Sequence, residues 1–166
     1  MKLSRALIVF WLGMILSLGL ITPSMADSWQ EQMLKSLNSI RSQEGLKPLE
    51  MCKPLTQAAQ KYAITMAKQN FLSHTGKDGS SFGERIQGAG YDWTNSTTGS
   101  TVAENIAAGQ SSVTEVMKGW RKSKGHYKNM VGQKFTHVGF GMATNPKSTY
   151  KTYWVQNFGA GAACSR

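Results

Sequence analysis

The sequence predicts an α+β fold in which helices pack on a small antiparallel sheet. Apolar residues recur every three or four positions in two segments near the start, over 29–40 and 55–66, as in amphipathic helices. Two later segments, THVGFGMA and STYKTYWVQNFG, are rich in β-branched and aromatic residues and are joined by a turn at NPK, which predicts a hairpin. Because helical segments flank the strands in sequence, helices should cover the sheet.

The first 26 residues have the pattern of a secretory signal peptide. Lys2 and Arg5 precede an apolar run from Ala6 to about Ile21, and the small residues Ser24 and Ala26 end the segment. This pattern predicts cleavage after Ala26 and a single domain over 27–166. The alternative is an uncleaved membrane anchor, because the apolar run is near the lower limit for crossing a bilayer.

Two helices should open the mature chain. The first ends near Gly45, and its apolar face consists of Trp29, Met33, Leu37 and Ile40. The second should begin at Pro54, a favoured first-turn residue, with Leu55, Ala59, Tyr62 and Met66 along its inward face. A polar loop over 70–79, which contains His74, follows the second helix.

The middle of the chain alternates helix starts and loops. Ser81 and Glu84 have the spacing of a capping box, which predicts a short helix that ends around Gly88 to Gly90. YDWTNSTTGS is a loop by composition. TVAENIAAG is either a short strand or an irregular buried stretch. Ser112 and Glu115 repeat the capping-box spacing, so another helix should run to about Ser123 and end before Gly125.

The mature chain carries a net charge of +8, since it has 17 basic and 9 acidic residues. Such a charge favours anionic partners, namely acidic lipids, cell-wall polymers, polysaccharides or nucleic acid. Most lysines are dispersed, and only RKSK at 121–124 forms a cluster. Export and this dispersion argue against nucleic acid.

The only two cysteines, Cys52 and Cys164, are predicted to form one disulfide, because an exported protein meets an oxidising compartment. Closing so long a loop contributes roughly 4 kcal/mol of stability in the chain-entropy model. Without CxxC spacing or a neighbouring histidine, a metal role for the cysteines is not expected.

The polar candidates for chemistry each have an ordinary alternative role. Glu84 can serve only as a capping partner, whereas Glu104 in the apolar stretch VAENIAA should be buried and therefore needs a cationic or hydrogen-bonding partner. His126 can be a helix-end histidine, His137 opens an aromatic strand, and His74 lies in a polar loop. No HExxH, GxSxG or phosphate-binding loop occurs. Imidazoles and carboxylates suit zinc, but their spacing predicts no shared site.

Five short motifs occur along the chain in the order HTG, GERI, AENIAAG, GHYKNM with FTHVGFG, and YWVQNFG. Together they resemble the CAP superfamily, also called the SCP or PR-1-like domain, in its bacterial secreted form, from about Met33 to Gly159. The chain differs from the better-known eukaryotic members, because Gly132 stands where those often have tryptophan and their cysteine-rich extensions are missing.

This resemblance implies an α-β-α sandwich with a central cleft lined by two histidines and two acids. The matching residues are His74 and His126, with Glu84 and Glu104. In the family the histidines can hold a divalent cation such as zinc, and the acids lie beside it. His137 falls outside the four matched positions.

Two classes of function follow from these expectations. The first is an exported, monomeric binding module, secreted or periplasmic, whose cleft or basic surface engages a lipid, glycan, cell-wall component or protein, with peripheral membrane contact included. The second is a metal-dependent hydrolase, in which zinc activates water and Glu104 or Glu84 is the general base. A site with two histidines is sparse for catalytic zinc, which usually has three protein ligands.

Overall fold

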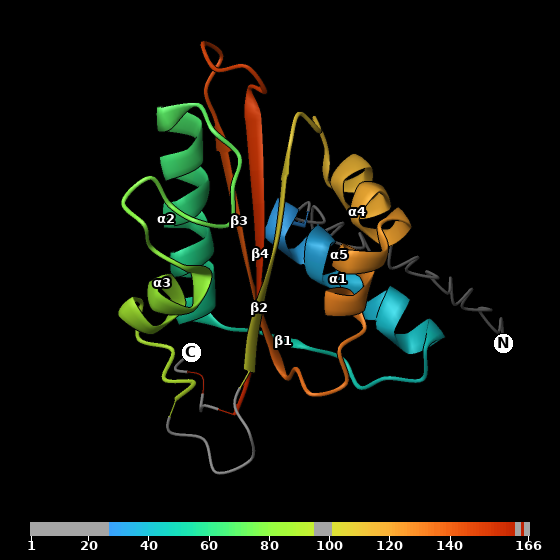
Figure 1. Ribbon diagram of the computed structural model, residues 1–166. Helices are drawn as coiled ribbons and strands as arrows, with labels where there is room; N and C mark the ends of the chain where they lie inside the picture. Colours follow the sequence, from blue (N-terminus) through green and yellow to red (C-terminus); the bar gives the residue numbers. More distant parts are fainter. Residues whose placement is uncertain (1–26, 95–100, 162–163, 165–166) are drawn as a thin grey trace, which may run out of the picture.

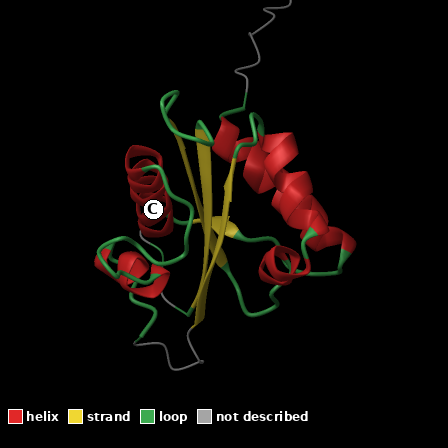
Figure 2. Cartoon of the chain, turned by 45° about the horizontal axis from the view of Figure 1, so that its top comes forward, coloured by secondary structure: helices red, strands yellow, loops and turns green. Residues whose placement is uncertain are grey.

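The protein has three layers, with a twisted sheet between two groups of helices (Figures 1 and 2). The computed structural model describes residues 27–94, 101–161 and 164. In chain order the elements are α1 (Trp29–Gln43), β1 (Glu50–Met51), α2 (Lys53–Gln69), α3 (Phe82–Gly88), β2 (Thr101–Ala108), α4 (Val113–Lys122), α5 (Lys124–Met130), β3 (His137–Thr144) and β4 (Thr152–Ala160). Helices α2 and α3 cover one face of the sheet, and α1, α4 and α5 cover the other. The predicted α+β class is therefore confirmed, whereas the predicted leader lies outside the described residues.

The sheet has the strand order β1-β3-β4-β2. The predicted hairpin is confirmed as β3 and β4, and β2 pairs antiparallel with the other side of β4, so TVAENIAA is a strand. One departure from the predicted antiparallel sheet is β1, which pairs parallel with β3 through Glu50 and Met51. A two-residue strand has no periodicity to recognise. Strand β2 forms one edge of the sheet.

The predicted helix starts are largely correct. Ser81 and Glu84 form a reciprocal capping box at α3, and Pro54 lies at the start of α2. At α4 only half of the box is present, because Ser112 accepts from the Glu115 amide while the Glu115 carboxylate accepts from Ser111.

Helix α5 was not predicted. The chain turns at Ser123 and resumes as helix at Lys124, so Gly125, expected to lie beyond a helix end, is inside α5. Burial of Met130 and partial burial of Tyr127 against the core offset the low helix propensity of this glycine.

Strand β3 lies unusually close to α2. A Cβ added at Gly139 would lie 2.2 Å from backbone atoms of Leu55 and Thr56, and one at Gly141 would lie 2.2 Å from the Ala59 backbone. The glycines of FTHVGFG therefore let helix and strand backbones touch. The alternate residues of β3, Val138 and Phe140, are fully buried on the opposite face with α1 and α4.

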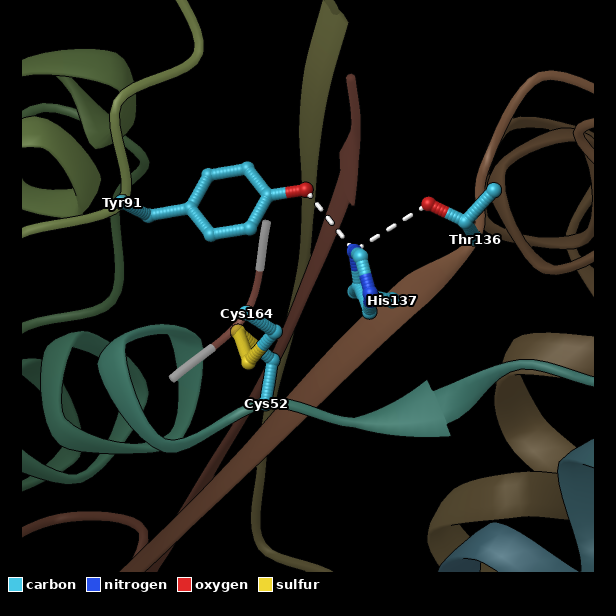
Figure 3. Close-up of a disulfide and its surroundings, with 5 residues drawn as sticks. All are labelled: Cys52, Tyr91, Thr136, His137 and Cys164. Atoms are coloured by element: carbon cyan, nitrogen blue, oxygen red, sulfur yellow. Dashed lines mark hydrogen bonds between the residues drawn. A yellow bond between two sulfur atoms is a disulfide. The ribbon is translucent and has the colours of Figure 1, made fainter. Parts of the chain in front are cut away.

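The predicted disulfide is confirmed between Cys52 and Cys164, which are 112 positions apart in sequence (Figure 3). Cys52 is fully buried immediately before α2, in a cluster with Leu55, Ile86 and Tyr91. The bridge thus ties the end of the chain to the start of α2.

Candidate functional site

Glu104 is the buried centre of the candidate site. The alternation of side chains along β2 directs Glu104 toward the layer of α2 and α3, and directs Asn105 toward α5. The carboxylate is 1% exposed. Its predicted burial is therefore confirmed, and so is its need for partners.

Arg85 on α3 supplies the compensating charge. Its Nη2 donates to Glu104 Oε2 at 3.1 Å and Oε1 at 3.3 Å, and also to the carbonyl of His74 at 2.9 Å. Its Nη1 donates to the carbonyl of Ser80 at 2.7 Å. The guanidinium lies over the Tyr62 ring, 3.4 Å from the centroid. Arg85 was not predicted as a site residue from the sequence. Two signals were available: its position beside Glu84 in GERI, and the need of the buried Glu104 for a cationic partner.

His74 contacts the same carboxylate from the loop after α2. Its Nδ1 lies 2.9 Å from Glu104 Oε1, and half of its side chain is exposed. Because an ionised carboxylate can only accept, Nδ1 carries a proton, and in the neutral form of the ring Nε2 has the free lone pair. Tyr62 fixes the loop by donating to the carbonyl of Ser73 at 2.6 Å. A histidine oriented by a carboxylate in this way is the usual arrangement at protein metal sites.

His126 comes from the opposite layer, in the first turn of α5. The alternative role as a helix-end histidine is wrong, because a new helix begins at Lys124 and the C-terminal helix dipole does not act on it. Burial lowers the pKa of His126, and the charge of His74 lowers this pKa further. His126 Nδ1 is buried and has no hydrogen-bond partner within the described ranges. The ring is therefore held neutral, the form that binds metals.

A network of amides holds the backbone around His126. Asn105 Nδ2 donates to the His126 carbonyl at 3.1 Å and to Gln156 Oε1 at 3.0 Å, and Asn129 Nδ2 donates to Asn105 Oδ1 at 2.9 Å. Both Asn105 and Gln156 are fully buried. This network was not predicted from the sequence either, although Asn105 in AENIAA is an amide side chain within an apolar stretch.

The loop after α2, which carries His74, and helix α5, which carries His126, lie in opposite layers beside the edge strand β2 (Figure 1). On the α5 side, Trp120 Nε1 donates to the Ile106 carbonyl at 3.2 Å and Asn129 Nδ2 to the Glu104 carbonyl at 3.4 Å, so these side chains cover part of the free edge. Among the described residues, no three or more His, Cys, Asp or Glu side chains gather in a metal-binding group.

Glu84 is positioned differently from Glu104. Its Oε2 accepts from the amide and hydroxyl of Ser81 at 2.8 and 2.9 Å, and these bonds lower the pKa of the Glu84 carboxyl. Glu84 also lines a cavity of about 490 Å³ between α2 and α3, which Lys61 and Arg85 line as well but neither His74 nor His126 does. The described contacts of Glu84 are thus those of a capping residue.

His137 does not join the other histidines. It opens β3, which β4 separates from β2. Its Nδ1 lies 3.1 Å from both the Tyr91 hydroxyl and Thr136 Oγ1, close to the disulfide (Figure 3). Burial lowers the pKa of His137, and Glu50 partly opposes this shift.

Comparison with known proteins identifies the family. The model of the cysteine-rich secretory protein family, CAP, matches residues 34–158, so the chain belongs to the CAP superfamily. Similar curated proteins include the uncharacterized protein YkwD of Bacillus subtilis, 29% identical over 136 residues, which are 82% of this chain and 49% of YkwD. The human Golgi-associated plant pathogenesis-related protein 1 is 28% identical over 122 residues, 73% of this chain and 77% of that protein.

Solved structures agree with this assignment. An extracellular protein containing an SCP domain from Bacillus anthracis is 28% identical, with a TM-score of 0.66 over 80% of this chain and 40% of that one. An outer surface protein of Borrelia burgdorferi shares the fold at 19% identity, with a TM-score of 0.67 over 80% of this chain and 92% of that one. The chain spans about half the length of YkwD and 34% of the B. subtilis membrane protein YlbC. Within the described part of the chain, no helix has the length and apolar character needed to cross a bilayer.

Proposed function

We propose that this protein is an exported binding module whose cleft, at the edge strand β2, holds a divalent cation through His74 and His126 and engages an extracellular or envelope ligand. The proposed location is secreted or periplasmic. The pattern of the first 26 residues supports export, as do relatives whose names call them extracellular or outer surface proteins.

The hydrogen bonds of Glu104 are the observation that favours a binding role over hydrolysis. Both of its oxygens receive hydrogen bonds from Arg85, one of them also from His74, and its side chain is 1% exposed. A general base for zinc-activated water needs a free lone pair within reach of that water. Glu104 is committed to positioning His74, and Glu84 is a capping residue that makes no described contact with His74 or His126.

The residues present fit a cation. Glu104 directs the Nε2 lone pair of His74 away from the carboxylate, and burial keeps His126 neutral. Imidazole nitrogens are ligands of zinc and related divalent ions, and a bound ion would act as a Lewis acid there. The His126 Nδ1 atom, buried and unpaired, is a polar group that a water or another partner would satisfy. Two protein ligands leave room in the coordination shell for a ligand donor.

An activity assay tests this choice directly. The mature protein, with zinc and with a chelator, should hydrolyse peptide, glycan and ester substrates no faster than background. The result that overturns the proposal is chelator-sensitive hydrolysis that disappears in both His126→Ala and Glu104→Gln, provided that both variants give wild-type circular dichroism spectra.

A further inference from the structure

The charges of this protein are segregated along the chain. All nine acidic residues of the mature chain occur at or before Glu115, whereas residues 116–166 contain nine basic residues and no acidic one. Five of these cations fall within eleven residues, and all five are exposed: Lys118, Arg121, Lys122, Lys124 and Lys128. We call these five residues the basic patch. It occupies α4 and α5.

Helix stability does not explain the basic patch. Arg121 and Lys122 suit the last turn of α4, where the helix dipole favours cations. Lys124, however, opens α5, where the dipole disfavours a cation and the first turn has no acid. Lys118 with Lys122, and Lys124 with Lys128, are like charges four residues apart on a helix, and such pairs are destabilising. Lys124 and the two like-charged pairs therefore cost stability.

Neighbouring acids do not neutralise the basic patch. The Glu115 carboxylate accepts from Ser111, and the Glu44 carboxylate accepts from the Tyr127 hydroxyl. Arg121 donates to the neutral side chain of Gln43 at 3.0 Å. No ion pair within residues 27–94, 101–161 and 164 includes a member of the patch.

A groove of about 380 Å³ between α1 and α4 adjoins the basic patch. Lys118 and Arg121 line it together with neutral side chains that both donate and accept hydrogen bonds: Gln32, Ser36, Ser39, Gln43 and Thr114. Ile40, Val113 and Met117 complete its lining. Cations suit sulfate, phosphate or carboxylate groups, and the amides and hydroxyls suit the alcohols of a sugar.

We propose that the basic patch and the α1–α4 groove bind an anionic polysaccharide. The proposal deepens the proposed function, since it names a ligand class for the binding module, but it does not use the histidine cleft. A membrane surface fits less well, because the exposed large apolar side chains of the described chain, Met51, Ile64, Leu72 and Tyr150, lie outside α1, α4 and α5. The patch thus has no large apolar side chain to insert beside its cations.

Dextran sulfate is a suitable probe, because it carries both anionic groups and sugar hydroxyls. Its affinity for the full mature protein is measured in chelator by fluorescence anisotropy at several salt concentrations. The variant Lys118→Gln/Lys122→Gln/Lys124→Gln should weaken binding about tenfold or more and reduce its salt dependence. The matched control is Lys53→Gln/Lys61→Gln/Lys68→Gln, which removes the same charge from exposed positions on α2, across the sheet, and should change affinity less than about twofold.

Two further arms separate sugar recognition from simple charge. Ser36→Ala/Ser39→Ala should weaken dextran sulfate binding but leave polyphosphate binding unchanged, because polyphosphate has no sugar hydroxyls. His74→Ala and His126→Ala should retain dextran sulfate affinity, so failure of the cleft does not affect this test. Equal losses in the two triple-lysine variants would overturn the proposal. So would absence of dextran sulfate binding alongside patch-dependent binding to vesicles of acidic phospholipid, which would identify a membrane surface instead.

Discussion

Replacing Glu104 by glutamine should strongly destabilise the protein. The carboxylate is 1% exposed and faces Arg85, which is 14% exposed. Removing one member of a buried ion pair costs about 3–5 kcal/mol, because the remaining charge is left uncompensated. Arg85 keeps its bonds to the carbonyls of Ser80 and His74, so we expect the free energy of unfolding to fall by about 3 kcal/mol, the lower end of that range.

Urea unfolding followed by tryptophan fluorescence measures this loss, with the disulfide intact. Glu84→Gln is the matched control, because this exposed carboxylate only caps α3, and its replacement should cost about 1 kcal/mol or less. The cost of Glu104→Gln should shrink in an Arg85→Met background, where no buried cation remains. A Glu104→Gln protein within about 0.5 kcal/mol of wild type would refute the buried-pair reasoning.

Three other predictions concern the frame around the site. Gly139→Ala should cost about 3 kcal/mol or prevent folding, because the new methyl group would overlap the α2 backbone. Gly119→Ala, where the new methyl group meets open space, should stabilise α4 by roughly 0.5–1 kcal/mol. Thermal unfolding of the two variants measures both effects. Cys52→Ser/Cys164→Ser should lower stability by about 4–5 kcal/mol in the chain-entropy model, and an unchanged melting temperature would contradict this. Burial lowers the pKa of His137, so the neutral ring stabilises the folded protein above pH 6.5 and this contribution is lost as the pH falls. His137→Gln should therefore flatten the decline in unfolding free energy between about pH 7 and 5. An unchanged slope of stability against pH would contradict this prediction.

Much of the fold was predictable because its signals are local. Capping residues, apolar periodicity and aromatic strands each occur within a few residues, so α1, α2, α3 and the β3–β4 hairpin could be predicted. The pairing of β1 with β3 and the restart of the chain as α5 depend on contacts between distant segments. Gly125 illustrates the limit, since its low helix propensity indicated an end and tertiary packing of α5 outweighed it.

The candidate site was predictable in part for the same reason. Glu104 could be predicted to be buried from its apolar neighbours, but only the folded chain identifies Arg85 as the partner and shows its second role in holding the His74 carbonyl. The resemblance that matched Glu84 and Glu104 as cleft acids did not distinguish their bonding. Their difference arises from α3, whose cap engages Glu84 while the next residue, Arg85, contacts Glu104.

Zinc affinity tests the central claim, that His74 and His126 together hold a divalent cation. Isothermal titration calorimetry of the mature protein at neutral pH, after treatment with chelator, should show one zinc ion bound per chain. His74→Ala and His126→Ala should each weaken that affinity by about tenfold or more, whereas His137→Ala, which changes a histidine outside the cleft, should leave it unchanged. Zinc affinity that is equal in all four proteins, or lost only in His137→Ala, would contradict the account.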